Sequence, residues 1–168
     1  MDGKAKILGH AIHPILIVFP LGLLGTAVVF DIIHMIWGNP VFAVAAYWML
    51  VAGLLGGLFA APFGLIDWIA IPSDTRAKSV GLTHAIVNVV ALLLFAVSWF
   101  MRNGAPEHPA MTASIFSIAG LVFALVGGWL GGELVERLGV GVHVGANPNA
   151  PSSLKSSSAS VNAAPHRP

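Results

Sequence analysis

Four long apolar blocks make up most of the chain, and short polar or turn-forming segments separate them. The blocks span residues 14–37, 41–66, 80–101 and 111–132. A helix rises about 1.5 Å per residue, so roughly 20 apolar residues cross a hydrocarbon layer of about 30 Å. The blocks are continuous and rich in Leu, Ala and Gly, whereas barrel strands alternate apolar and polar residues. The pattern therefore predicts an all-α membrane protein with four transmembrane helices in an up-and-down bundle.

The segments around the blocks complete the predicted organisation. Residues 1–13 form a short N-terminal segment, 14–142 the four-helix domain and 143–168 a tail. We interpret the first block as retained, because it is longer than the apolar region of a signal peptide and ends without a small-x-small cleavage site. Gly38-Asn39-Pro40 suits a tight hairpin, and longer loops are expected at 67–79 and 102–110. The tail is rich in Ser, Ala, Asn and Pro, which predicts disorder.

Basic residues give the predicted orientation, because cytoplasmic loops of membrane proteins are enriched in Lys and Arg. Only Arg102 falls on one side of the four predicted spans. The other side collects Lys4, Lys6, Arg76, Lys78 and Arg137. We therefore expect both termini to be cytoplasmic.

Composition excludes several classes of protein. Hydrophobic residues make up 57% of the 168 positions and charged residues only 9%, against about 25% charged residues in a typical soluble domain. The chain contains no Cys, which excludes disulfides, thiolate metal sites and Cys nucleophiles. A formal net charge of +1 gives no reason to expect a nucleic-acid partner. A phosphate-binding loop, a nucleophile elbow and a His-Glu-x-x-His motif are all missing, so a stand-alone enzyme is disfavoured.

Ionisable residues gather at the predicted cytoplasmic ends of the spans. Each helix carries at least one of them there: His10 and His13, Asp67, His84, and Glu133. His10 and His13 are three residues apart and share a helix face. His84 lies deepest, about 6 Å inside the boundary if its helix begins near residue 80. We treat this His/acid ring as the candidate functional site.

Three kinds of chemistry suit such a ring. Neutral imidazoles on facing helices can be the two axial ligands of a b-type haem, with His13 and His84 as the first choice and His10 as an alternate. His13 and His84 could instead bind a divalent metal together with Asp67 and Glu133. A proton or ion relay is the third hypothesis. The competing interpretation is a structural or accessory subunit without a cofactor, in which these groups merely occupy the hydrated headgroup region.

The opposite leaflet and the helix interiors carry weaker signals. Asp31 and His34 share a face near Trp37, which is typical of an interfacial cap, and His108 lies in the outer loop. Pro20 and Pro62 should bend the first two helices. The second and fourth blocks are rich in Gly, and small residues let helices approach closely or pack against a partner or a second copy.

Several motifs together resemble a known bacterial membrane family. They are His13-Pro14 with Pro20, Gly64-Leu65-Ile66-Asp67-Trp68, Ile71-Pro72, Thr75-Arg76-Ala77, His84-Ala85 with Asn88, Gly131-Gly132-Glu133-Leu134-Val135, and Gly139-Val140-Gly141-Val142. This set resembles the family called domain of unknown function 2231 over about residues 8–145. The resemblance implies four helices in the bacterial inner membrane but no activity. Some members are fused to Rieske-type domains, which implies a redox role, and with no Cys here the iron–sulfur cluster would lie on a partner protein.

Overall fold

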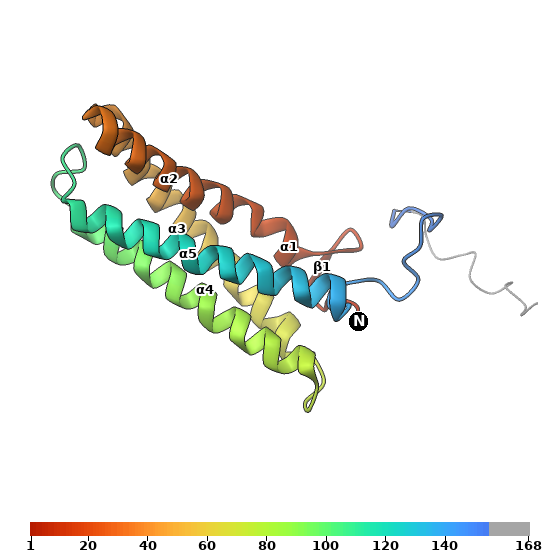
Figure 1. Cartoon of the computed structure of the whole chain (residues 1–168). Helices are drawn as coiled ribbons and strands as arrows, with labels where there is room; N and C mark the ends of the chain where they lie inside the picture. Colours follow the sequence, from red (N-terminus) through yellow and green to blue (C-terminus); the bar gives the residue numbers. More distant parts are fainter. Residues whose placement is uncertain (155–168) are drawn as a thin grey trace, which may run out of the picture.

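Four helical spans lie side by side in the computed structural model, which describes residues 1–154 (Figure 1). They are α1 and α2 (Ile12–Leu16 and Val18–Trp37), α3 (Pro40–Ile69), α4 (Arg76–Met101), and α5 (Met111–Gly132), which the π-helix η1 (Glu133–Arg137) continues. All four are long and apolar enough to cross a membrane. The predicted all-α fold with four transmembrane helices is thereby confirmed.

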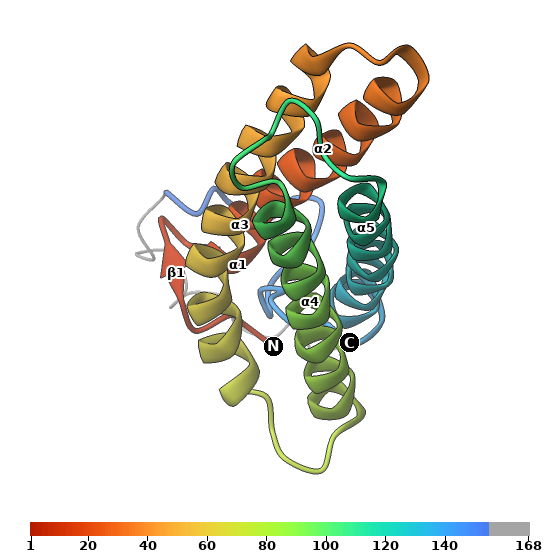
Figure 2. The ribbon, with the colours of Figure 1, turned by 90° about the vertical axis from the view of Figure 1, so that its left-hand side faces the viewer.

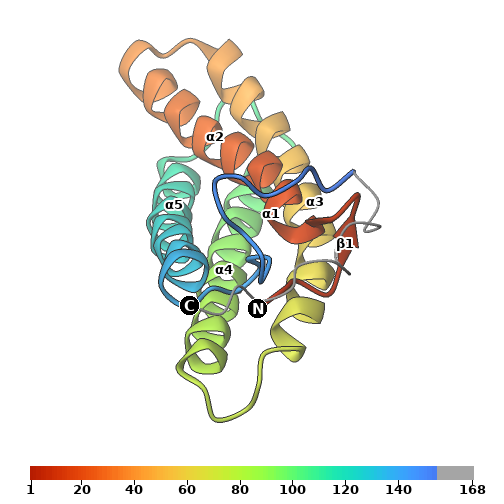
Figure 3. The same ribbon diagram turned by 90° about the vertical axis from the view of Figure 1, so that its right-hand side faces the viewer.

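The helices form two hairpins that close into a ring. α2 packs along α3, and α4 packs along α5; the hairpins then meet through α3 against α4 and through α2 against α5. α2 and α4 therefore occupy one diagonal of the bundle, and α3 and α5 the other (Figures 2 and 3). The N-terminus and the C-terminal end of α5 lie at the same end of the bundle. We call this the terminal end.

The connection between α2 and α3 is the tight hairpin that the sequence predicts. Gly38 has φ of +67°, a left-handed conformation that glycine adopts without a steric penalty. The Asn39 side chain then accepts a hydrogen bond of 3.0 Å from the backbone N–H of Val41, and Pro40 is the first residue of α3. Gly, Asn and Pro thus each serve the end of one helix or the start of the next.

Two helices extend further than their apolar blocks. α3 continues to Ile69 and α4 begins at Arg76, so the connection between them is shorter than the expected loop at 67–79. The Thr75 hydroxyl caps α4 by accepting a hydrogen bond of 3.1 Å from the backbone N–H of Lys78. Hydrophobicity marks the part of a helix that lies in lipid, whereas the hydrogen-bonded helix extends into the polar interface.

The first span is interrupted at Ile17, between α1 and α2. Pro20 has no N–H to donate to the carbonyl of Leu16, which explains the interruption on its N-terminal side. α3, in contrast, remains one helix through Pro62. α1 already begins at Ile12, so His13 belongs to a helix and not to the preceding segment.

Residues outside the spans add little regular structure. Two short antiparallel strands, β1 (Lys6–Ile7) and β2 (His10–Ala11), precede α1. Residues 143–154 contain turns without a helix or strand. The rest of the tail expected to be disordered, residues 155–168, falls outside the described residues.

The core is small and lies between the hairpins. It consists of Leu24, Ala27, Val28, Ala46, Leu50 and Phe95. Many large apolar side chains instead point outward, with Trp37, Phe100 and Ile36 each 71% exposed. Outward apolar side chains are the expected surface of a bundle whose solvent is lipid.

Candidate functional site

Two of the predicted histidines meet at the terminal end of the bundle. His13 extends from α1 and His84 from α4, and their ring centres are 6.4 Å apart with the ring planes at 85°. Both side chains are half-buried. The pair joins the two hairpins across the diagonal, with α3 and α5 on either side.

Hydrogen bonds to main-chain carbonyls orient both rings. Nδ1 of His13 lies 3.0 Å from the carbonyl oxygen of Ala60 on α3, and Nδ1 of His84 lies 2.9 Å from that of Gly127 on α5. A carbonyl oxygen can only accept, so each hydrogen bond requires a proton on Nδ1. In the neutral rings, the lone pair is then on Nε2, the form in which histidine binds metals.

Glycines on α3 and α5 make room for these rings. A Cβ atom at Gly64 would lie 2.8 Å from Cε1 of His13, and one at Gly131 would lie 3.3 Å from Cε1 of His84. Other glycines serve helix packing, as the sequence predicts: a Cβ at Gly53 would lie 2.7 Å from Leu24. On α3, Gly53 therefore serves helix packing and Gly64 makes room for an imidazole. The spacing of the glycines along the sequence does not distinguish these two roles.

The other members of the predicted ring are exposed or make contacts with other residues. Oδ1 of Asp67 accepts hydrogen bonds from the backbone N–H groups of Lys4 at 2.6 Å and Ala5 at 3.3 Å, so it anchors the N-terminal segment. Glu133 forms an ion pair of 2.6 Å with Arg76. His10 is exposed.

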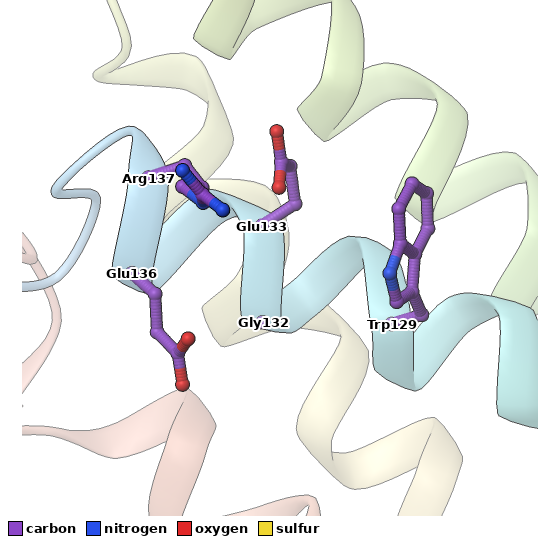
Figure 4. Close-up of a pocket in the computed structure, with 5 residues that line it drawn as sticks. All are labelled: Trp129, Gly132, Glu133, Glu136 and Arg137. Carbon is purple, nitrogen blue, oxygen red and sulfur yellow. The ribbon is translucent and has the colours of Figure 1, made fainter.

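A mixed imidazole–carboxylate centre consequently has little support in the part of the chain that the structure describes. Within residues 1–154, no group of three or more His, Asp or Glu side chains could hold a metal ion. A shallow hollow of about 340 Å³ lies beside Glu133 on α5 and η1. Figure 4 shows the carboxylates of Glu133 and Glu136 pointing in opposite directions from the helix, so they do not converge on one ligand.

A buried charge network at the opposite end of the bundle is the main feature that the sequence reasoning missed. Arg102 donates to both carboxylate oxygens of Asp31, at 2.5 and 2.6 Å. Its guanidinium also lies 3.0 Å from the hydroxyl of Ser117 and 3.1 Å from that of Ser98. Arg102 is 1% exposed and Asp31 0%.

This network corrects the interpretation of Asp31 as part of an interfacial cap. Arg102 begins the loop after α4, as predicted, but its side chain is buried in the bundle. Of Asp31 and His34, it is His34 that makes a cap-like contact, since its Nδ1 lies 2.9 Å from the carbonyl oxygen of Asn39 in the hairpin. An isolated charge inside a span is costly, so opposite charges at the same end of two predicted spans are expected to pair. That rule, applied to Asp31 and Arg102, would have found the ion pair.

The fold and the surface of the bundle define the class of protein to which this chain belongs. A bundle of four apolar helices with lipid-suited side chains on its outside is a multi-pass integral membrane protein. More specifically, the model of the family domain of unknown function 2231, described as a predicted membrane protein, matches residues 9–144. The chain belongs to this family, as its motifs suggest. Comparisons with curated proteins and with solved structures find no match.

Proposed function

We propose that this protein is a small electron-transfer subunit of the bacterial inner membrane that holds a b-type haem between His13 and His84. The meeting of these two imidazoles, each with Nδ1 bound to a main-chain carbonyl, is the observation that carries the proposal. The family's name provides no activity, so the proposal rests on the site alone. Both termini would be cytoplasmic, and the redox partner would be another membrane or membrane-associated protein.

The two imidazoles belong to one site. Their ring centres are 6.4 Å apart, and a carbonyl of a different neighbouring helix orients each ring, Ala60 on α3 and Gly127 on α5. His13 and His84 would therefore hold one metal through Nε2.

The residues around the rings also suit a haem. Neutral imidazoles with a free Nε2 are its usual ligands in helix bundles. Gly64 on α3 and Gly131 on α5 place no side chain beside the rings, and the buried residues between this site and the charge network at the other end, among them Ala91 and Phe95, are apolar. His13 and His84 would hold the iron, while Ala60 and Gly127 orient these ligands through their carbonyls. Bound haem would supply one-electron exchange.

Absorption spectra of the purified protein test this function. Protein from a haem-sufficient host is expected to show a stoichiometric Soret band that shifts on reduction. His13→Ala and His84→Ala should each lower the haem content at least tenfold, because each removes one of the two side chains that would hold the iron. His10→Ala is the matched control and should retain haem. Haem-free wild-type protein would contradict the proposal, and elemental analysis of the same sample would test a non-haem metal.

A cofactor-free accessory subunit is the second candidate, and outward-facing glycines favour it. A Cβ at Gly22 and Gly25 on α2, or at Gly128 and Gly132 on α5, would meet nothing within 4 Å. Such faces permit close approach of a partner helix. In this case the purified protein would lack haem and metal and would co-purify with a membrane protein, and Gly128→Leu would weaken that association.

Proton or ion passage receives less support. The polar residues His84 and Asn88 lie at one end of α4, and Ser98 and the C-cap residue Arg102 lie at the other. Buried Ala91 and Phe95 separate the two groups. Phe95 belongs to the apolar core. The two polar regions are thus separated by apolar packing, which electrons can cross more readily than ions.

A further inference from the structure

Asn88 lies one helical turn beyond His84 and touches its ring. Its Nδ2 donates a hydrogen bond of 2.8 Å to the main-chain carbonyl of His84. The same Nδ2 atom lies 3.3 Å from Nδ1 and 3.4 Å from Nε2 of the imidazole. Nearly equal distances to both ring nitrogens place the amide over the face of the ring, not in line with either lone pair.

Gly127 provides the space that this arrangement needs. A Cβ there would lie 2.6 Å from Oδ1 and 2.7 Å from Nδ2 of Asn88, which is too close for any side chain. The carbonyl of the same glycine accepts the hydrogen bond from Nδ1 of His84. Gly127 therefore both admits the amide and orients the ring.

We infer that Asn88 is a positioning residue for His84. Its amide is held by the His84 carbonyl, covers one face of the imidazole and keeps Nδ1 directed at Gly127. With the proton retained on Nδ1, the lone pair stays on Nε2, where a metal could bind. The inference rests on the proposed function for the ligand role of His84, but the orientation of the ring can be measured without any cofactor.

Nitrogen NMR of histidine-labelled protein in phosphatidylcholine vesicles, prepared without haem, tests the positioning directly. In the wild type, the neutral ring of His84 should be protonated almost entirely on Nδ1, with a small Nε2-protonated fraction as the baseline. Asn88→Ala should increase the Nε2-protonated form at least fivefold, because the ring can then turn away from the Gly127 carbonyl.

Two further variants make the experiment specific. Gly127→Ala should have the same effect as Asn88→Ala, since the added Cβ expels the amide while Asn88 remains. Thr83→Ala is the matched control: this exposed neighbour on α4 also hydrogen-bonds one turn back, to Ser79 at 3.1 Å, and its loss should leave His84 unchanged. An Nε2-protonated fraction that stays at the wild-type baseline in both Asn88→Ala and Gly127→Ala would overturn the inference.

Haem-loaded protein separates this inference from the proposed function. Removing a group that orients a metal ligand typically weakens metal binding 10–100-fold, so Asn88→Ala should accelerate haem dissociation at least tenfold. A wild type that binds no haem would overturn the proposed function while the tautomer measurement still decides the role of Asn88. Haem binding with unchanged dissociation and an unchanged tautomer in Asn88→Ala would overturn the positioning role alone.

Discussion

A Cβ atom at Gly64 would lie 2.8 Å from Cε1 and 2.9 Å from Nδ1 of His13, so the absence of a side chain there decides where the imidazole can lie. The ring occupies the space that any larger residue would fill. From this position it reaches the carbonyl of Ala60, one turn earlier on α3. The orientation of a candidate ligand thus depends on a residue with no chemistry of its own.

Gly64→Ala is accordingly expected to displace the His13 ring and to destabilise the protein by about 1–3 kcal/mol, as overpacking of a filled site does. Thermal unfolding in detergent measures the change in stability, and haem content measures the change at the site. Gly128→Ala is the control, because its Cβ would meet nothing within 4 Å and alanine is the better helix former by about 0.5–1 kcal/mol. Equal melting temperatures for the two variants would contradict this explanation.

Helices are joined across the bundle by one polar pair near each end. His13 and His84 link α1 to α4 at the terminal end, and Asp31 and Arg102 link α2 to α4 at the other. The Ser98 hydroxyl, 2.7 Å from the Ala113 carbonyl, extends the second link to α5. Because the ion pair joins the two hairpins, it should hold them in the arrangement that brings the histidines together.

Removing one charge of the buried pair is expected to cost about 3–5 kcal/mol, since the other charge stays buried without a partner. Asp31→Leu and Arg102→Met should each show this loss in thermal unfolding, whereas the double variant should recover most of it. The ion pair between Arg76 and Glu133 is the matched control, because the Arg76 side chain is 63% exposed and that of Glu133 20% exposed, against 0% for both members of the buried pair. Arg76→Met should therefore cost less than about 1 kcal/mol. Additive losses in the double variant would show that the pair is not coupled.

At the scale of the whole molecule, the lack of cysteine permits a clean test of orientation. The exposed residue Asn103 lies in the loop between α4 and α5, and the exposed Ser73 lies in the loop between α3 and α4, at the opposite end of the bundle. With cytoplasmic termini, an impermeant thiol reagent should label Asn103→Cys in spheroplasts and label Ser73→Cys only after lysis. The reverse labelling pattern would contradict the predicted orientation.

Much of the fold could be predicted from the sequence because the bilayer imposes simple requirements. Lipid cannot satisfy backbone polar groups, so four apolar blocks of sufficient length must become four helices. The glycine, asparagine and proline at 38–40 likewise require a tight hairpin for local reasons. The helix ends were harder. Thr75 caps the start of α4, and Nζ of Lys78 donates to the carbonyls of Trp68 and Ile69 at the end of α3, but hydropathy alone scores these polar residues as loop.

The sequence by itself determined the four spans and placed His13 and His84 at the same end of the bundle as a candidate ligand pair. Only the tertiary structure decided that these two meet while Asp67 and Glu133 bind elsewhere. The reason is that the rotation of each helix about its axis sets which side chains face one another. The same rotation buries Asp31 against Arg102, so residues 71 positions apart became a single charge network that no local pattern reveals.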